Sequence, residues 1–184
     1  MGIDSIQHLE LLVLNKDHPF WQKAIGFANN SSWSAGPFLA NKMKANDFLE
    51  WERVVVAVIN NEIVGYCTFT KDDELPVEHN ISPFIGFVFV DEQYRGHRIS
   101  EKMINAAITY AKTLGYQKVY LMSSEKGLYE KYGFIKIGDY KTIFKTIDQL
   151  FYKSIWIKAT SNLTSCFYND CVIMNKKSEY SSAW

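Results

Sequence analysis

The sequence predicts a single α/β domain (α+β), with a central sheet of six to seven strands flanked by about four helices. Short β-rich runs alternate with amphipathic helical patterns along the chain, which favours strands and helices in one layered core. The 184 residues, 47% of them hydrophobic and 22% charged, suffice for one ordinary domain. We assign this domain to residues 1–157 and expect residues 158–184 to form a polar C-terminal tail or an extra strand.

The first half of the chain has the patterns of three strands and two helices. They are a strand at 6–14, a helix at 17–27, a helix at 37–46, and strands at 51–59 and 63–70. The Leu-rich run at 6–14 also suits a helix. Asp17 is expected to cap the first helix ahead of Pro19. Asn60-Asn61-Glu62 lies between two β-rich runs and predicts a hairpin.

The second half begins with a polar loop at 71–82 and continues with four strands and two helices. They are a strand at 84–90, a helix at 100–114, a strand at 119–123, a short helix at 126–132, and strands at 134–137 and 149–157 joined by a loop at 138–147. The first of these strands is aromatic and β-branched throughout, which is typical of a strand buried on both faces. Gly115 is expected to end the long helix.

The segment from residue 84 to residue 100 predicts a phosphate-binding turn. A strand followed by a tight turn and a helix start directs free backbone N–H groups, and the positive end of the helix dipole, at one point. Arg95, His97 and Arg98 add positive charge to that turn, and Gly96 lets the backbone approach a ligand. Ser100 is expected to be the N-cap of the helix.

The charge and cysteine content excludes several classes of protein. Twenty basic and twenty acidic residues cancel, so no overall field attracts nucleic acid or an anionic membrane. No apolar stretch reaches the length of a membrane-spanning helix. Cysteines 67, 166 and 171 form no disulfide framework, which favours a reduced cytoplasmic location, and Cys67 is expected to be a small core residue.

Two segments together resemble the GCN5-related N-acetyltransferase family. Arg95-Gly96-His97-Arg98-Ile99-Ser100 resembles the family's acetyl-CoA loop, Arg/Gln-x-x-Gly-x-Gly/Ala, with Arg98 and Ser100 in place of small residues. Gly127 to Phe134 resembles its Leu-Tyr-Glu-Lys-x-Gly-Phe element. The resemblance covers residues 50–155. It implies a mixed, mostly antiparallel sheet in which the fourth and fifth strands splay apart, and a bacterial-type acetyltransferase.

The resemblance also implies the ligand and its site. Acetyl-CoA would donate the acetyl group, with no metal involved, and its pantetheine would pair with free backbone groups of the fourth strand. Tyr129 matches the family's proton donor to the departing thiolate. The implied cofactor-binding residues are Val88, Phe89, Val90, Arg95, Gly96, His97, Arg98, Ile99, Ser100 and Ser124.

The general base is not fixed by the sequence. Some family members carry a glutamate early in the fourth strand, where this chain has Phe84. We name Glu78 as the base, with His79 beside it, and leave open that both are solvated loop residues. Glu52 and Asp91 are poorer candidates, and Asp91 is expected to order the turn before Arg95.

The leading hypothesis is an N-acetyltransferase in which a primary amine attacks acetyl-CoA directly in a ternary complex. The acceptor is a small-molecule amine or a peptide amine, and a homodimer is compatible with the exposed late strands. A non-catalytic acyl-CoA-binding sensor domain is the alternative. A nucleotide-binding regulatory domain is disfavoured because the chain lacks both a P-loop and a dinucleotide-binding motif.

Overall fold

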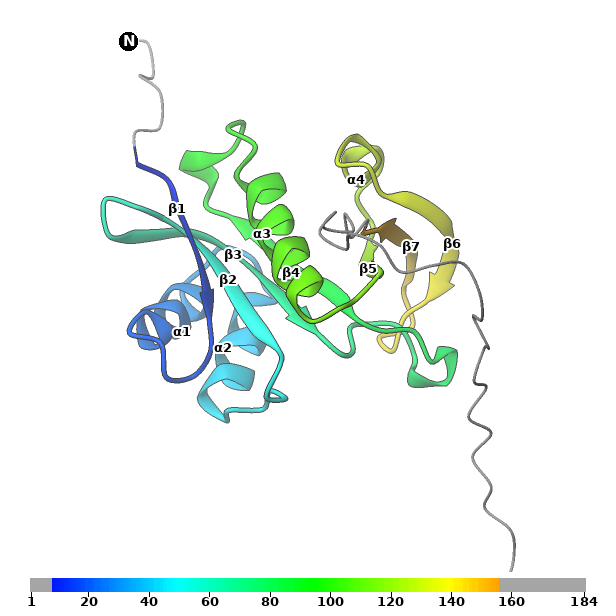
Figure 1. Ribbon diagram of the computed structural model, residues 1–184, viewed down its shortest axis with the longest axis horizontal. Coiled ribbons are helices and arrows are strands. Elements are labelled where there is room, and N and C mark those ends of the chain that lie inside the picture. Colours follow the sequence, from blue (N-terminus) through cyan, green and yellow to red (C-terminus); the bar gives the residue numbers. More distant parts are fainter. Residues whose placement is uncertain (1–7, 156–184) are drawn as a thin grey trace, which may run out of the picture.

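The computed structural model describes residues 8–155, which form a seven-stranded sheet in the order β1-β2-β3-β4-β5-β7-β6 (Figure 1). The strands are β1 (Glu10–Leu14), β2 (Arg53–Ile59), β3 (Glu62–Thr70), β4 (Phe84–Val90), β5 (Lys118–Ser123), β6 (Ile135–Lys141) and β7 (Ile147–Ser154). Strands β4 and β5 are parallel, and the other neighbours are antiparallel. The expected mixed, mostly antiparallel sheet is confirmed.

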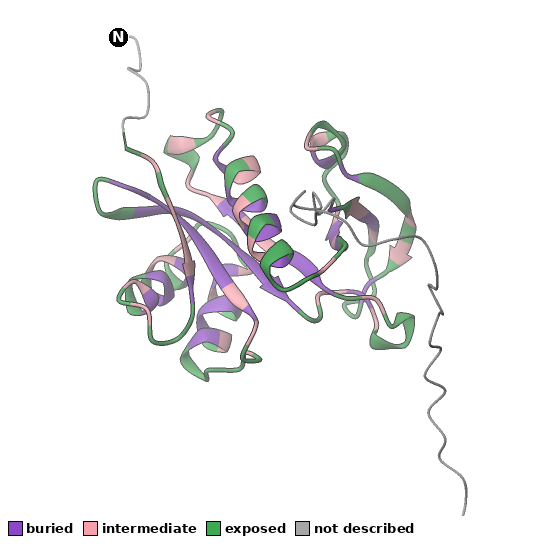
Figure 2. Ribbon diagram, viewed as in Figure 1, coloured by how far each residue is buried: buried purple, intermediate pink, exposed green. Residues whose placement is uncertain are grey.

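Three of the four described helices cover both faces of the N-terminal half of this sheet, and the fourth contacts β6. The helices are α1 (Trp21–Asn29), α2 (Gly36–Lys44), α3 (Ile99–Thr113) and α4 (Leu128–Lys131), with 3-10 turns η1 (Val77–His79) and η2 (Glu92–Tyr94). Side chains alternate along β2, so Val54, Val56 and Val58 pack with α1 and α2 while Val55 and Ala57 pack with α3. The buried residues form one core on each side of the central strands and a third, smaller cluster of Leu75, Phe84, Met122 and Leu150. Figure 2 shows the buried positions along the strands and helices.

Strands β4 and β5 part from each other, as the family resemblance implies. Among the described residues they have a single register pair, Phe84 with Tyr120. A bulge lies further along β4, because Gly86 pairs with Thr68 and Phe89 pairs with Tyr66. Two residues of β4, Phe87 and Val88, thus oppose one residue of β3, and Phe87 has a positive φ of 47°. The sheet therefore opens beside β4, whose residues are apolar throughout.

The start of the chain differs from the sequence-based expectation. Strand β1 begins at Glu10, and positions 6 and 7 lie outside the described residues. Helix α1 begins at Trp21 with Phe20 as its N-cap, so the prediction of a cap at Asp17 was wrong. A proline disfavours helical backbone in the residue before it, and Pro19 therefore keeps His18 in a turn ahead of the helix.

Helix α3 also begins differently from the prediction. Its N-cap is Arg98, which has left-handed backbone with φ 56°, and Ser100 is already the second helical residue. The expected cap at Ser100 was wrong because the turn closes at Arg98. The Ser100 hydroxyl instead shares a hydrogen bond of 2.9 Å with the hydroxyl of Tyr132. At the other end, Gly115 has a positive φ of 82° and follows the last turn, as expected.

The last two strands extend further into the connecting loop than the sequence predicted: β6 ends later and β7 begins earlier. The expected loop at 138–147 shrinks to residues 142–146, where the Thr142 amide donates to the Thr146 carbonyl at 2.8 Å. Gly138, a loop signal in the sequence, instead lies at an irregularity in the pairing of β6 with β7. The expected end of the last strand at 156–157 and the tail at 158–184 lie outside the described residues.

None of the helices within residues 8–155 has both the length and the apolar character needed to cross a bilayer. Cys67 is fully buried in β3, as expected of a small core residue.

Candidate active site

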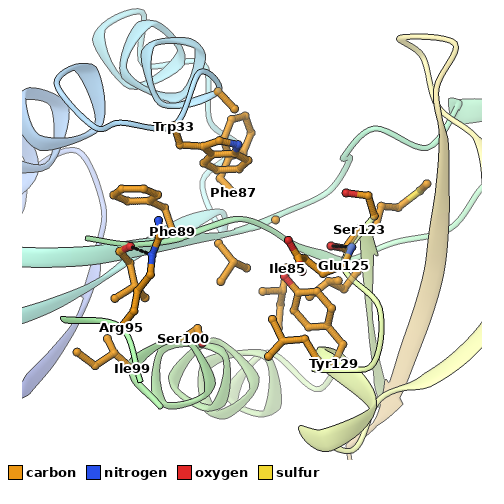
Figure 3. Close-up of a pocket in the computed structure, with 18 of the residues that line it drawn as sticks. Trp33, Ile85, Phe87, Phe89, Arg95, Ile99, Ser100, Ser123, Glu125 and Tyr129 are labelled. Atoms are coloured by element: carbon orange, nitrogen blue, oxygen red, sulfur yellow. Dashed lines mark hydrogen bonds between the residues drawn. The ribbon is translucent and has the colours of Figure 1, made fainter. Parts of the chain in front are cut away.

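A cavity of about 950 Å³ lies where β4 and β5 part. Its wall includes β4 from Ile85 to Val90, the turn leading into α3, the end of β5 and helix α4. The loop between α1 and α2 closes it on one side, and acidic residues from the β3–β4 loop and β7 line it on another. Figure 3 shows β4 crossing this space, with Trp33 and Phe87 on one side and Ser100 and Tyr129 on the other.

Strand β4 presents its backbone and its bulge to the cavity. Val88, Phe89 and Val90 all line it, so the three residues expected to pair with pantetheine are brought together. The carbonyl oxygen of Val90 already accepts a hydrogen bond of 3.0 Å from Nε of Arg95. The bulge at Phe87 and Val88 is the place where β4 departs from regular pairing and can offer an N–H to a ligand.

The turn into α3 forms the second wall of the cavity. Gly96, with φ 84°, and Arg98, with φ 56°, both have left-handed backbone, and a Cβ added at Gly96 would meet no described atom within 4 Å. Ile99 and Ser100 follow as the first residues of a 15-residue helix, whose leading N–H groups have no partner inside the helix. Such a start attracts negative charge. His97 has its backbone in this turn but is not part of the cavity wall described within residues 8–155.

The two arginines of this turn are held by neighbouring carboxylates. Arg95 donates to Glu92 at 2.7 Å, and Arg98 donates to Glu101 at 2.8 Å. Both arginine side chains are more than half exposed, at 55% and 69%, so these surface pairs hold them weakly. Each guanidinium can therefore turn toward a phosphate group at small cost.

Tyr129 projects from α4 toward β4 (Figure 3). Its side chain is 6% exposed and packs against the rings of Tyr132, Phe134 and Phe151, and the residue lines the cavity. Burial raises the pKa of Tyr129 to about 12, and a hydrogen bond with Ser123 partly opposes that rise. The phenol is therefore protonated at neutral pH and can donate a proton into the cavity.

Five carboxylates that the sequence analysis missed line the cavity: Asp73 and Glu74 from the β3–β4 loop, Glu92 from η2, Glu125 after β5, and Asp148 from β7. Burial raises the pKa of Glu74, and the charge of Asp148 raises it further. The acidic run Asp72-Asp73-Glu74 within the polar loop was the only signal that could have identified the first two. Nothing local in the sequence connects Asp148 with them.

The carboxylates named from the sequence lie elsewhere. Glu78 is exposed on η1, outside the described cavity wall, and His79 is exposed with its ring edge-on to Tyr140 at 5.4 Å. Glu52 is buried and accepts hydrogen bonds from the amides of Leu49 and Lys71, which is a structural role. Asp91 accepts from the Gln93 amide at 3.0 Å and so orders the turn, as expected.

An aromatic wall also escaped the sequence analysis. Trp33, from the loop between α1 and α2, stacks on Phe89 with ring centroids 6.4 Å apart and an interplanar angle of 7°. Its ring also packs edge-on against Phe87 at 6.0 Å.

Ser124, expected to contact the cofactor, is exposed just after β5 and also lines the cavity.

The acetyltransferase (GNAT) family model matches residues 13–134, which is more than half of the chain. The chain belongs to this family. The GNAT match includes β4, its bulge, the turn into α3 and Tyr129, so the expected family resemblance is confirmed over the cavity. The protein is accordingly an acetyl-CoA-dependent N-acetyltransferase.

Solved structures support the GNAT fold. An aminoglycoside 6'-acetyltransferase type Ii superimposes with a TM-score of 0.63 at 15% identity, covering 81% of this chain and 99% of the other. An aminoglycoside 6'-N-acetyltransferase complexed with coenzyme A gives 0.61 at 13% identity, with coverages of 81% and 98%. A spermidine/spermine N-acetyltransferase from Vibrio cholerae gives 0.55 at 18% identity, with coverages of 81% and 94%. No curated protein sequence matches the chain closely enough to be counted as a relative.

No group of three or more histidine, cysteine, aspartate or glutamate side chains within residues 8–155 is arranged to hold a metal ion.

Proposed function

We propose that this GNAT protein transfers the acetyl group of acetyl-CoA to a primary amine of a small molecule, by direct attack in a ternary complex. One observation carries the proposal: a single cavity joins the helix start at residues 96–100 to the bulge of β4 and to Tyr129. A diphosphate, a pantetheine arm and a thioester can therefore be held in sequence along one wall.

The donor would be held mostly by backbone groups. The diphosphate would bind the amides between Gly96 and Ser100, where Arg95 and Arg98 can turn inward. Pantetheine would run along Val88 and Phe89 as an added strand in the gap beside β4. The thioester oxygen would then lie at the bulge, where one N–H donor to a developing oxyanion can be worth ~3 kcal/mol.

Tyr129 would donate the proton that the leaving thiolate needs. The residue lines the cavity from the α4 side, and its raised pKa keeps the phenol protonated throughout the neutral range. When the carbon–sulfur bond breaks, the thiolate takes the phenol proton and leaves as neutral CoA thiol. No group in this step forms a covalent bond to the acetyl carbon except the attacking amine.

The acceptor would enter from the side of α1 and α2. The cavity wall includes the ring of Trp33, from the loop between α1 and α2, and the carboxylates of Asp73, Glu74 and Asp148. Carboxylates attract the ammonium form of an amine, and an aromatic ring favours both apolar contact and cation–π contact. A small-molecule amine fits these features, and several structures with this fold are named for aminoglycoside or spermidine substrates.

A homodimer through the β6 edge is part of the proposal. Ile135, Ile137, Phe144 and Ile147 are each exposed by 44% or more on the β6–β7 hairpin, and β6 is the last strand of the described sheet. Such an edge, rich in exposed apolar residues, favours pairing with a second copy.

A cytoplasmic location is also proposed, because three cysteines without a disulfide framework suit a reducing compartment.

Release of free CoA thiol tests the proposed reaction. We expect acetyl-CoA to yield CoA with at least one amine in a panel that includes spermidine, kanamycin and a peptide amine, and to raise the thermal stability of the protein. A single burst of acetyl transfer to the protein in the absence of amine would contradict direct attack. Binding of acetyl-CoA without turnover on any amine would instead support the sensor alternative.

A further inference from the structure

The β3–β4 loop brings the carboxylate of Asp73 directly against β4. A Cβ added at Gly86 would lie 3.0–3.1 Å from the carboxylate atoms of Asp73, closer than most real Cβ contacts. Gly86 is thus the residue that leaves room for this side chain. Both residues line the cavity, and the next two residues along the strand, Phe87 and Val88, form the bulge.

This contact places Asp73 close to the expected site of the reaction. Consecutive Cα atoms are about 3.8 Å apart, so the carboxylate over Gly86 lies on the order of 4–8 Å from the bulge amides. A carboxylate at that distance reaches an amine at the bulge directly or through one water. Glu78, in contrast, is exposed on η1, outside the described cavity wall.

Asp73 and Tyr129 approach β4 from opposite faces of the sheet. Ile85 and Tyr129 belong to the core on the α3 side. Side chains alternate along a strand, so the position of Gly86 faces the α1 and α2 side, and the Asp73 carboxylate lies on that face. A thioester in the gap beside β4 would therefore have a proton donor on one side and a carboxylate on the side from which the acceptor enters.

We propose that Asp73 is the general base of this enzyme and that it takes the proton which the acceptor ammonium must lose before attack. The inference rests on the proposed function. Asp73 removes one proton from the ammonium, the amine nitrogen bonds to the acetyl carbon, and the carbon–sulfur bond breaks. Tyr129 protonates the thiolate and regains a proton from the nitrogen through water, and Asp73 releases its proton to solvent. The products are the amide, CoA thiol and one proton.

The groups around Asp73 adjust it to this task. Burial, helped by the negative charges of Glu74 and Asp148, raises the pKa of Asp73 to about 7. A hydrogen bond from the Glu74 backbone and the charge of Lys42 on α2 act in the opposite direction. A base is most effective when its pKa lies near the working pH, because it is then both available and able to hold the proton.

The pH dependence of kcat/KM for Asp73→Asn tests the assignment. The assay would measure CoA release from pH 5 to pH 9, with acetyl-CoA and the best acceptor of the amine panel. The wild-type protein should lose activity as the pH falls through about 7. We call this fall in kcat/KM toward low pH the acid limb. Asp73→Asn should lower kcat by about 10²- to 10⁴-fold and remove the acid limb, while acetyl-CoA affinity stays the same. Asp73→Glu should keep an acid limb and recover part of the rate.

Two neighbouring variants make the test independent of simple damage. Glu74→Gln removes a negative charge beside Asp73, so the acid limb should move to lower pH. Asp72→Asn is the matched control, because Asp72 is 51% exposed beside Lys71 and lies outside the cavity wall. The kcat of this variant and the pH of its acid limb should match those of wild type. A fold-dependent loss would instead affect all these variants in parallel with their melting temperatures.

The outcomes separate this inference from the proposed function. Turnover with an unchanged acid limb in Asp73→Asn overturns the base assignment alone. Loss of the limb in Glu78→Gln, with the limb retained in Asp73→Asn, transfers the role to Glu78. Should Asp73→Asn fail to fold, an unmoved limb in Glu74→Gln overturns the assignment. Absence of turnover with every amine overturns the proposed function, and the base assignment with it.

Discussion

The guanidinium of Arg95 donates a hydrogen bond of 3.0 Å to the carbonyl oxygen of Val90, which ties the turn before α3 to the last residue of β4. The same side chain pairs with Glu92 and lies over the ring of Phe89 at 5.9 Å. Arg95 therefore belongs to both proposed donor-binding walls, the phosphate turn and the pantetheine strand. A ligand that draws Arg95 toward a phosphate must also free the Val90 carbonyl for pairing.

Tyr129→Phe should slow turnover much more than it weakens acetyl-CoA binding. The change removes the hydroxyl proton and keeps the ring that packs against Phe134 and Phe151. We expect kcat to fall by about 10²-fold or more, with a dissociation constant for acetyl-CoA near that of wild type. Steady-state kinetics and calorimetry on the same preparation measure the two effects. Turnover that survives intact would remove Tyr129 from the mechanism.

Tyr132→Phe is the matched control for that variant. Tyr132 also lines the cavity, but its hydroxyl is already engaged with Ser100. The loss of that hydrogen bond should lower stability by about 1 kcal/mol and leave kcat within a few-fold of wild type. An equal fall in kcat for both variants would mean that the effect is not specific to the proposed proton donor.

Gly96→Glu should abolish acetyl-CoA binding. The residue has a positive φ of 84° and lines the cavity, so a glutamate there adds backbone strain, bulk and a negative charge where the diphosphate is expected. Gly96→Ala separates the causes, since it carries only strain of roughly 1–2 kcal/mol and should still bind. Calorimetric titration with acetyl-CoA distinguishes them. Full affinity in Gly96→Glu would mean that the phosphates bind elsewhere.

Trp33→Ala should raise the KM for the acceptor while the affinity for acetyl-CoA remains near wild type. The indole stacks on Phe89 and contacts Phe87, on the side of β4 that we propose for the acceptor. Loss of this surface should cost about 1 kcal/mol or more of acceptor binding, or at least a five-fold rise in KM. A rise confined to the donor's KM would instead assign Trp33 to the acetyl-CoA side.

The stability of the protein should depend on the protonation of Asp73. A carboxyl whose pKa is raised in the folded state favours folding when it is protonated. That contribution is complete below the unfolded pKa of about 4 and is lost as the pH rises to about 7, the value in the folded protein. The melting temperature of wild type should therefore fall over this interval relative to Asp73→Asn. Parallel curves for the two proteins would contradict the raised pKa of this carboxyl group.

The two walls proposed to hold the donor could be located from the sequence because their signals are local. Strand 84–90, the turn at 91–98 and the apolar stripe of the next helix are adjacent in the chain, and their residue types report burial and turn geometry directly. The exact helix start could not be predicted in this way. Arg98 has left-handed backbone, which the sequence gives no reason to expect of an arginine, and Ser100 consequently does not cap.

The proposed acceptor side could not be predicted because its residues meet only in the folded chain. Asp73 is separated from Asp148 by most of the second half of the sequence, and Trp33, from the loop between α1 and α2, packs against Phe87 of β4. Each was, by itself, an ordinary loop or strand residue. The sequence therefore points to Glu78, the acidic residue nearer to strand 84–90 along the chain, whereas in the structure Asp73, and not Glu78, lines the cavity.

Hydrogen exchange of the backbone amides, with and without acetyl-CoA, tests the central claim most directly. The claim is that main-chain groups of β4 and of the turn into α3 hold the donor together. We predict that saturating acetyl-CoA slows exchange both at residues 87–90 and at residues 96–100, and that Gly96→Glu shows neither effect. Protection confined to other segments, or binding that leaves both stretches exchanging as before, would contradict the account.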